Sequence, residues 1–240
     1  MKPPEDQPDE MTSCKNKSGE DRAQALMNAH MQKAYTLLNQ VVEKYGVTMP
    51  VLSKAMGEFA KGMMAPPEGT VCAEGCAYCC HLRVGVSIPE LLVLFSELSN
   101  QATPEGLSWF KGRIMATVSK GDTLTETFWH SSQTPCPFLN DQGRCLIYAI
   151  RPFSCRAYHS TEVAACRRGW EERREVRVPC FPLYRTATDM YSAVFIRVMK
   201  ERGLASFQVG LVKGLAMLFD TPGLTEQWLA GKDVFRPAAF

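Results

Sequence analysis

Ten residues of this chain read Cys72-Ala-Glu-Gly-Cys76-Ala-Tyr-Cys79-Cys80-His81, so four thiols and one imidazole lie in a single short segment. An isolated cysteine in a core behaves as a small apolar side chain, but thiols grouped this closely can share one soft metal ion or cluster. A helix would bring the four Cβ vectors within about 100° of arc. An extended chain would turn Cys79 and Cys80 to opposite sides. The spacing permits chelation in either conformation.

The composition offers no structural reason for so many thiols. A chain of 240 residues, 45% of them hydrophobic, can bury a core as one large or two small domains, so its ten cysteines are not needed as covalent staples. The first 20 residues contain no apolar signal sequence, and no apolar run reaches the roughly 18 residues that cross a membrane. We therefore expect a cytoplasmic protein without membrane contact. In a reducing compartment, grouped cysteines bind metal or act in redox chemistry more often than they form disulfides.

Arginine replaces lysine around the later cysteines. The formal net charge is only +2, yet residues 121–199 contain ten of the fifteen arginines and no lysine. Four thiolates on Zn²⁺ leave a net charge of about −2, and arginine, which stays charged when partly buried, is suited to offset it. An ordinary solvated basic face is the alternative. Nucleic acid is not an expected partner, because acidic residues are interleaved with these arginines and the chain is not strongly basic.

Apolar periodicity predicts a helical scaffold on both sides of the cysteines. Residues 1–20 contain no aromatic or branched aliphatic side chain, which predicts a disordered tail that includes Cys14. Apolar residues at a 3.6-residue period predict helices over 21–45, 50–64, 87–98, 103–120, 188–202 and 206–219. Ser87-Ile-Pro-Glu90 has the pattern of a capping box. Residues 175–179 alternate as in a short edge strand.

The second cysteine region is expected to fold back on itself. Turn-forming residues at 140–143 separate two short apolar runs, which predicts a β-hairpin over 136–148. Such a hairpin would return Cys145 near Cys136.

Three further cysteines follow this hairpin. Pro152 keeps the approach to Cys155 out of a helix, and Cys166 follows a short helix that starts near residue 160. Cys180 is interpreted as a buried thiol, with an additional ligand as the alternative.

Several motifs recur in a fixed order: Gly75-Cys-Ala-Tyr-Cys-Cys-His81, Cys136-Pro-Phe-Leu139, Cys145-x-Ile-Tyr148, Arg151-Pro152, Cys155-Arg156-x-Tyr158 and Cys166. In this order they resemble the YkgJ-type cysteine-cluster family of zinc- or iron-chelating domains. The resemblance spans about residues 72–166 and implies metal chelation by the cysteines, but no settled biochemical activity. The leading spacing here is Cys72-x3-Cys76, whereas the family often has Cys-x2-Cys.

The resemblance implies eight metal ligands, all of them cysteines: Cys72, Cys76, Cys79, Cys80, Cys136, Cys145, Cys155 and Cys166. Eight thiols can complete two four-coordinate sites or one site with spare thiols, and spacing does not separate zinc from iron or from an iron-sulfur cluster. Cys76 and Cys79, at the x2 spacing, are the pair predicted to share one metal. His81 and His159 adjoin the cysteines, and we assign them to packing around the site rather than to ligation.

An enzymatic interpretation is the alternative. Cys72-x3-Cys76-x-Tyr78-Cys79 also matches the signature of radical S-adenosylmethionine enzymes, in which three cysteines leave one iron open to the cofactor. Such enzymes need repeated βα units, and the segments after Cys80 are predicted helices without apolar strands between them. The leading hypothesis is therefore a metal-binding protein of unassigned activity. The alternative is an iron-sulfur redox protein or cluster-dependent transferase, so whether the chain is an enzyme stays open.

The predicted fold is mostly α, a helical scaffold around an irregular cysteine-rich metal-binding centre with a short β-hairpin. Its regions are a disordered tail (1–20), N-terminal helices (21–65), the cysteine-cluster metal-binding region (66–182) and C-terminal helices that pack on it (183–240). The predicted cofactor is zinc or iron, the latter also as an iron-sulfur cluster. A metal ion is the only partner that the sequence indicates.

Overall fold

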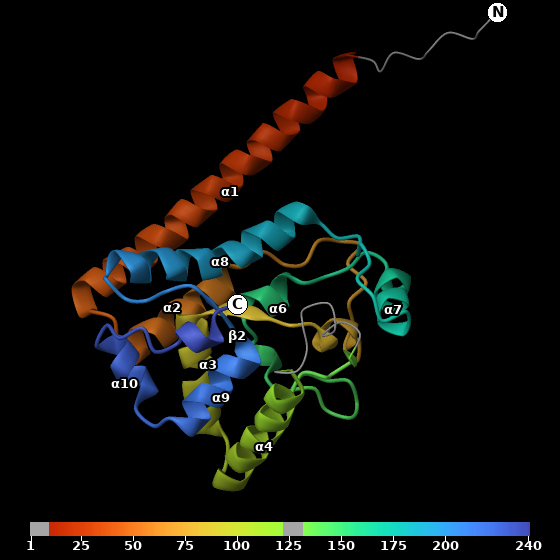
Figure 1. Cartoon of the computed structure of the whole chain (residues 1–240). Coiled ribbons are helices and arrows are strands. Elements are labelled where there is room, and N and C mark those ends of the chain that lie inside the picture. Colours follow the sequence, from red (N-terminus) through yellow and green to blue (C-terminus); the bar gives the residue numbers. More distant parts are fainter. Residues whose placement is uncertain (1–9, 122–131) are drawn as a thin grey trace, which may run out of the picture.

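The computed structural model describes residues 10–121 and 132–240, and it confirms the mostly helical fold (Figure 1). The elements before the second cysteine region are α1 (Glu10–Tyr45), α2 (Met49–Gly62), the 3-10 turn η1 (Tyr78–His81), β1 (Gly85–Ser87), α3 (Ile88–Gln101) and α4 (Pro104–Gly121). Those that follow are η2 (Tyr148–Ile150), α6 (Phe153–Ala157), α7 (Val163–Glu171), α8 (Pro182–Glu201), β2 (Gln208–Gly210), α9 (Leu211–Asp220), α10 (Leu224–Leu229) and η3 (Arg236–Ala238).

The long helix α1 packs on the molecule by its C-terminal half and extends away from it toward its N-terminus (Figure 1). Leu38 and Val42 are buried where α1 lies against α8. At the same junction the Tyr35 hydroxyl donates a hydrogen bond to Glu201 at 2.7 Å. His30, one turn earlier, lies 2.5 Å from the Tyr191 hydroxyl.

The start of α1 differs from the prediction. The helix begins at Glu10, although composition assigns residues 1–20 to a disordered tail. Each residue added to an existing helix gains a local hydrogen bond without burying apolar surface, so an argument from missing apolar residues does not exclude such an extension. Residues 1–9 lie outside the described part of the chain.

The core is built around α3, which enters it immediately from β1. The Ser87 side chain accepts a hydrogen bond from the Glu90 backbone N–H, and the Glu90 carboxylate accepts one from the Ser87 N–H, which confirms the predicted capping box. Leu91 and Leu94 on the same helix are fully buried. A satisfied cap therefore starts the helix at the point where its apolar residues reach the core.

The last third of the chain closes this core from the other side. Strand β2 pairs antiparallel with β1, with Val86 opposite Val209, and leads directly into α9. A Cβ added to Gly214 of α9 would lie 2.6 Å from the Leu91 side chain. The two helices therefore approach each other closely at a point where only glycine fits.

Three local predictions need correction. Residues 175–179 form no strand, and β1 with β2 makes up the only sheet in the part of the chain that the structure covers. Helix α8 begins at Pro182 rather than at residue 188, because proline lacks the N–H that the first helical turn leaves unused. Helix α9 begins at Leu211 rather than at residue 206, because residues 208–210 are taken up by β2.

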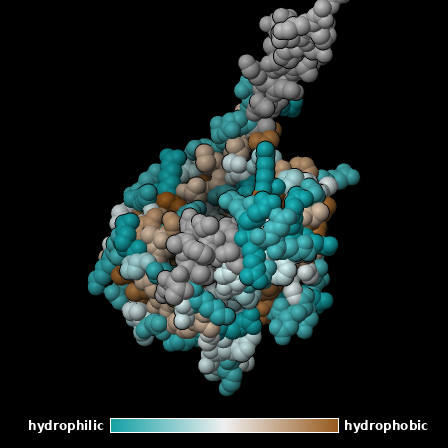
Figure 2. Space-filling view, turned by 45° about the vertical axis from the view of Figure 1, so that its right-hand side comes forward, coloured by the Kyte–Doolittle hydropathy of each residue, from teal (hydrophilic) through white to brown (hydrophobic). Residues whose placement is uncertain are grey.

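The surface shows no single apolar face on the side seen in Figure 2, where hydrophilic residues are interspersed with small hydrophobic areas. Within the described residues, none of the helices combines the length and apolar character needed to cross a bilayer.

Candidate metal centre

The hairpin of the second cysteine region lies against the first cysteine segment. The backbone N–H of Cys136 donates a hydrogen bond to the Cys80 carbonyl at 2.7 Å. At the far end of the hairpin, a Cβ on Gly143 would lie 2.9 Å from the Gly75 carbonyl oxygen. Close backbone contact at both ends therefore aligns the two segments, although they lie more than 50 residues apart in the sequence.

The predicted hairpin is present in a shortened form. Leu139 and Cys145 form an isolated antiparallel bridge, and the Asn140 N–H donates to the Arg144 carbonyl at 3.0 Å. The Asn140 side chain also accepts hydrogen bonds from the Gln142 and Arg144 N–H groups, which is the turn chemistry that the sequence indicated. Cys145 is thereby brought back toward Cys136, as predicted.

Helix α7 places Cys166 beside the first segment. The Trp170 ring packs edge-on against the rings of Tyr78 and His81 in η1, at centroid distances of 6.2 and 6.0 Å. The Arg167 guanidinium donates to the Tyr78 hydroxyl at 3.3 Å. These aromatic contacts hold the helix that carries Cys166 against the turn that carries Cys79 and Cys80.

Helix α6 places Cys155 against β1 and α3. The fully buried Glu90 carboxylate accepts a hydrogen bond from the Phe153 N–H at 2.9 Å, and the Ser154 hydroxyl donates to the Gly85 carbonyl at 2.8 Å. Pro152 keeps an extended conformation before α6, as the sequence predicts, but Cys155 itself is helical. Glu90, which belongs to the capping box of α3, thus also anchors α6, the helix that carries Cys155.

The eight predicted ligands are all free thiols. Cys72 is exposed and the other seven are partly buried. Across residues 10–121 and 132–240, however, no three His, Cys, Asp or Glu side chains are arranged so that they could hold a metal ion. The fold gathers the segments that carry the thiols without closing a coordination shell, so metal binding would require side-chain rotation or small backbone shifts.

Burial and mutual repulsion keep several of these thiols protonated. Burial raises the pKa of Cys136 to about 11. Burial also raises the pKa of Cys155 strongly, with a further contribution from the charge that Cys136 would carry. A hydrogen bond with Cys80, followed by burial, raises the pKa of Cys79. A bound cation would remove the repulsion and favour the thiolates.

The charge interactions divide the thiols into two neighbourhoods. The first thiol group consists of Cys72, Cys76 and Cys166. The second thiol group consists of Cys136, Cys145 and Cys155. Within each group, the charge on one thiol would raise the pKa of another, and Cys79 acts in this way on members of both. Cys79 therefore interacts electrostatically with thiols of both groups.

The two neighbouring histidines have other roles in the described structure. His159 is buried, and its Nδ1 lies 2.8 Å from the Ala157 carbonyl while its Nε2 accepts a hydrogen bond from the Phe181 N–H at 2.8 Å. Both ring nitrogens of His159 therefore have hydrogen-bonding neighbours in the described structure. The Nδ1 of His81 lies 3.1 Å from the Ala77 carbonyl. Cys180 is partly buried, so the prediction of a buried thiol holds only in part.

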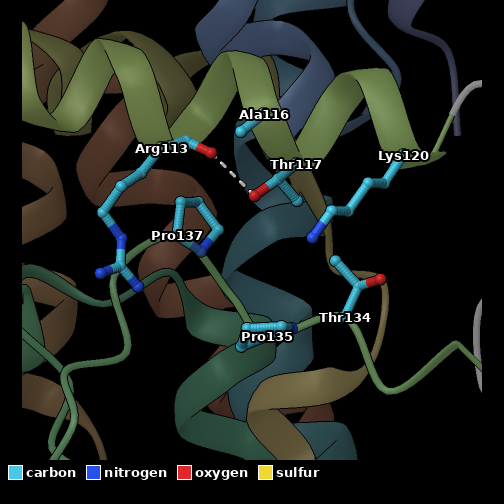
Figure 3. Close-up of a pocket in the computed structure, with 7 residues that line it drawn as sticks. All are labelled: Arg113, Ala116, Thr117, Lys120, Thr134, Pro135 and Pro137. Carbon is cyan, nitrogen blue, oxygen red and sulfur yellow. Dashed lines mark hydrogen bonds between the residues drawn. The ribbon is translucent and has the colours of Figure 1, made fainter.

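A hollow of about 160 Å³ lies beside the hairpin (Figure 3). It is lined by Arg113, Ala116, Thr117, Lys120, Thr134, Pro135 and Pro137. The Arg113 guanidinium donates to the Leu139 carbonyl at 2.7 Å, so this arginine of α4 holds the hairpin in place. The sequence did not single out this contact, because the two residues belong to elements without a common motif.

Comparison with known proteins supports the cysteine region alone. Residues 71–180 match a family model named CxxCxxCC and described as "Putative zinc- or iron-chelating domain". The match begins one residue before Cys72, ends at Cys180 and includes all eight predicted ligands. No curated protein and no solved structure matches the chain.

Proposed function

We propose that the chain binds zinc or iron through its cysteines, because residues 71–180 match the CxxCxxCC family model. The observation that carries the proposal is the meeting of three stretches of the chain that are distant in sequence: residues 72–81, 136–148 and 153–171. Hydrogen bonds, aromatic contacts and a buried carboxylate bring the η1 turn, the hairpin and the helices α6 and α7 together, and each of these carries at least one thiol. Soft thiolates suit both metals.

We further propose that the thiols form two sites rather than one. Each thiol group supplies three ligands, and Cys79 and Cys80 supply the fourth ligand of each. This division uses all eight family-matching cysteines in two four-coordinate shells, the number that structural zinc prefers. Cys79 and Cys80 are adjacent in η1 and hydrogen-bond each other, so the two shells would meet at this pair.

The chemistry of loading follows from the state of the thiols. Each thiol that binds the metal gives its proton to solvent, and the metal supplies the charge that stabilises the thiolates. Zinc would act as a structural link among the three segments, whereas iron would add redox activity. We place the protein in the cytoplasm, because free thiols in this number persist in a reducing compartment.

The two iron-sulfur alternatives differ in the fold that they require. A radical S-adenosylmethionine enzyme would need repeated βα units, but the one sheet in the described residues has two antiparallel strands. An iron-sulfur redox protein does not depend on such a scaffold and remains the competing function.

The test is elemental analysis of protein purified without oxygen. We expect zinc or iron in a ratio of about two per chain, from eight ligands at four per metal, and no acid-labile sulfide. A brown sample that contains sulfide would replace the proposal by the iron-sulfur alternative. Protein that lacks both metals, even after reconstitution with either ion under reducing conditions, would refute metal binding.

Two cysteine variants test the division into two sites. Cys79→Ser removes the thiol that interacts with both groups, and we expect the affinity for at least one metal to fall by roughly tenfold or more. Cys180→Ser is the matched control, because Cys180 is also a partly buried free thiol but is not among the proposed ligands. Equal metal binding by both variants would show that Cys79 is not a ligand.

A further inference from the structure

The side chain of Arg151 occupies an unusual position at the cysteine centre. Arg151 lies between η2 and α6, and its guanidinium stacks over the Tyr148 ring at 3.8 Å. Its Nε is buried and has no hydrogen-bond partner in the part of the molecule that the structure describes. A buried N–H without an acceptor is destabilising, so a fold that keeps one calls for an acceptor that arrives later.

Thiols flank this arginine, because the hairpin before it carries Cys145 and the helix α6 after it carries Cys155. The positive charge of Arg151 lowers the pKa of Cys79 and of thiols in both groups, namely Cys72, Cys145 and Cys155. A neutral thiol is a weak acceptor, whereas a thiolate forms a charge-assisted hydrogen bond. The partner of Nε would therefore appear when a metal converts neighbouring thiols to thiolates.

The neighbouring Arg156 is already engaged with the backbone through two of its nitrogens. Its Nε donates to the Arg151 carbonyl at 2.7 Å, and its Nη2 donates to the Ala149 carbonyl at 2.6 Å. These bonds hold the backbone on which Arg151 stands. Arg156 thus fixes the segment, and the Nε of Arg151 is left without an acceptor.

On the basis of the function proposed above, we propose that Arg151 is a positioning residue of the metal centre: its Nε–H donates a hydrogen bond to a metal-bound thiolate and its charge offsets the negative charge of the loaded centre. Four thiolates around a divalent ion carry about two excess negative charges, which a nearby guanidinium partly neutralises. The affinity for metal then depends on a residue that is not itself a ligand.

The experiment compares three variants of the full-length, reduced protein. Arg151→Met keeps the length and apolar contact of the side chain without charge or donors, and Arg151→Lys keeps the charge without the Nε–H. Arg174→Met is the control, because Arg174 is an exposed arginine paired with Glu172. Zinc affinity is measured by competition with a coloured chelator. The sulfur-to-cobalt absorption of the Co²⁺-loaded protein reports the number of bound thiolates.

We expect Arg151→Met to weaken zinc binding by about 10- to 100-fold, the range typical of residues that support metal ligands. Arg151→Lys should lose less, and Arg174→Met should bind zinc as the unmodified chain does. Without metal, Arg151→Met should melt at the same temperature as the unmodified chain or above it, because the variant loses an unsatisfied buried donor. A residue with a merely structural role would instead lower the melting temperature with and without metal.

Unchanged zinc affinity in Arg151→Met would overturn the inference while leaving the proposed function intact. Failure of the unmodified chain to bind zinc or iron would overturn both. If Arg151→Met does not fold, Arg151→Lys decides: zinc affinity equal to that of the unmodified chain refutes the role of the Nε–H. A several-fold loss with unchanged cobalt ligand number supports it.

Discussion

The helical body and the cysteine region are stabilised in different ways. Helix α3 buries eight of its 14 residues, and α8 and α9 pack around it with further buried side chains. The turns η1 and η2, by contrast, contain no fully buried residue, and the cysteines on and between them are only partly buried. The body is therefore stabilised mainly by apolar burial. The cysteine region joins that core through Phe138, Ile147 and Phe153 and is otherwise held by hydrogen bonds and a few aromatic contacts.

The comparison implies that metal and apolar burial stabilise separate parts of one molecule. A perturbation of the body should unfold everything. A perturbation of the cysteine centre should loosen the segments that carry the thiols and leave α3 in place.

The largest effect is expected in the body, at the close approach of α3 and α9. Leu91→Ala should lower the free energy of unfolding by about 2–5 kcal/mol, because it leaves a cavity in a fully buried site. Gly214→Ala should also destabilise, although alanine favours a helix by roughly 1 kcal/mol over glycine, because its Cβ would lie 2.6 Å from Leu91.

The double variant sharpens this prediction. Since Leu91→Ala removes the atoms that the new Cβ would strike, the two changes together should cost less than their sum in chemical denaturation. Strict additivity would show that the helices do not meet at these residues.

Removal of the metal should have the next largest effect. At a metal concentration of 100 times Kd, binding to the folded state adds about 2.7 kcal/mol of stability, so a chelator should lower the melting temperature. In hydrogen exchange, residues 136–148 and 72–81 should lose protection while α3 keeps it. Equal loss of protection in α3 would contradict the separation of the two regions.

Glu90 joins the two regions, and its replacement should affect both. Glu90→Gln leaves one acceptor oxygen where the carboxylate has two, one that accepts from the N–H and hydroxyl of Ser87 and one that accepts from the Phe153 N–H of α6. The amide therefore cannot satisfy both sets of donors. We expect a loss of about 1.5–3 kcal/mol, the range for hydrogen bonds to charged groups, together with weaker metal binding through the displacement of α6. Denaturation and metal competition on the same variant measure the two effects. Glu97→Gln, an exposed change on the same helix, serves as its control.

The smallest effect is expected at the surface of the cysteine region. Arg144 and Glu74 form an exposed ion pair at 3.0 Å between the hairpin and the first segment. Arg144→Gln should change stability by at most about 1 kcal/mol, as exposed pairs do. Thermal melting with metal present measures it. A larger loss would mean that this pair, rather than backbone contact, aligns the segments.

The sequence predicted well where the signal was local. The capping box at Ser87 and Glu90, the turn at Asn140 and most helix positions followed from side chains acting within a few residues of one another. The prediction of an edge strand at 175–179 was wrong, because strand formation depends on a distant partner. Alternation alone does not make a strand, because a strand needs a partner and this segment has none in the described structure.

The candidate site shows the same difference between local and long-range information. Its residues could be listed from the sequence, because thiols in that number and spacing have a chemistry of their own. The sequence predicted that arginines offset thiolate charge, but it did not single out Arg151 among the ten or give Glu90 a second partner at Phe153. Both facts depend on contacts between distant segments.

By itself, the sequence determined the helical scaffold, the identity of the sulfur donors and the place of the turns, since periodicity, capping and side-chain chemistry act locally. The tertiary structure decided which thiols interact electrostatically, that Cys79 acts on both groups, and that the Nε of Arg151 is buried without an acceptor. The physical reason is that these relations arise from packing among α3, α6, α7 and α8, where burial and approach distance depend on residues far apart along the chain.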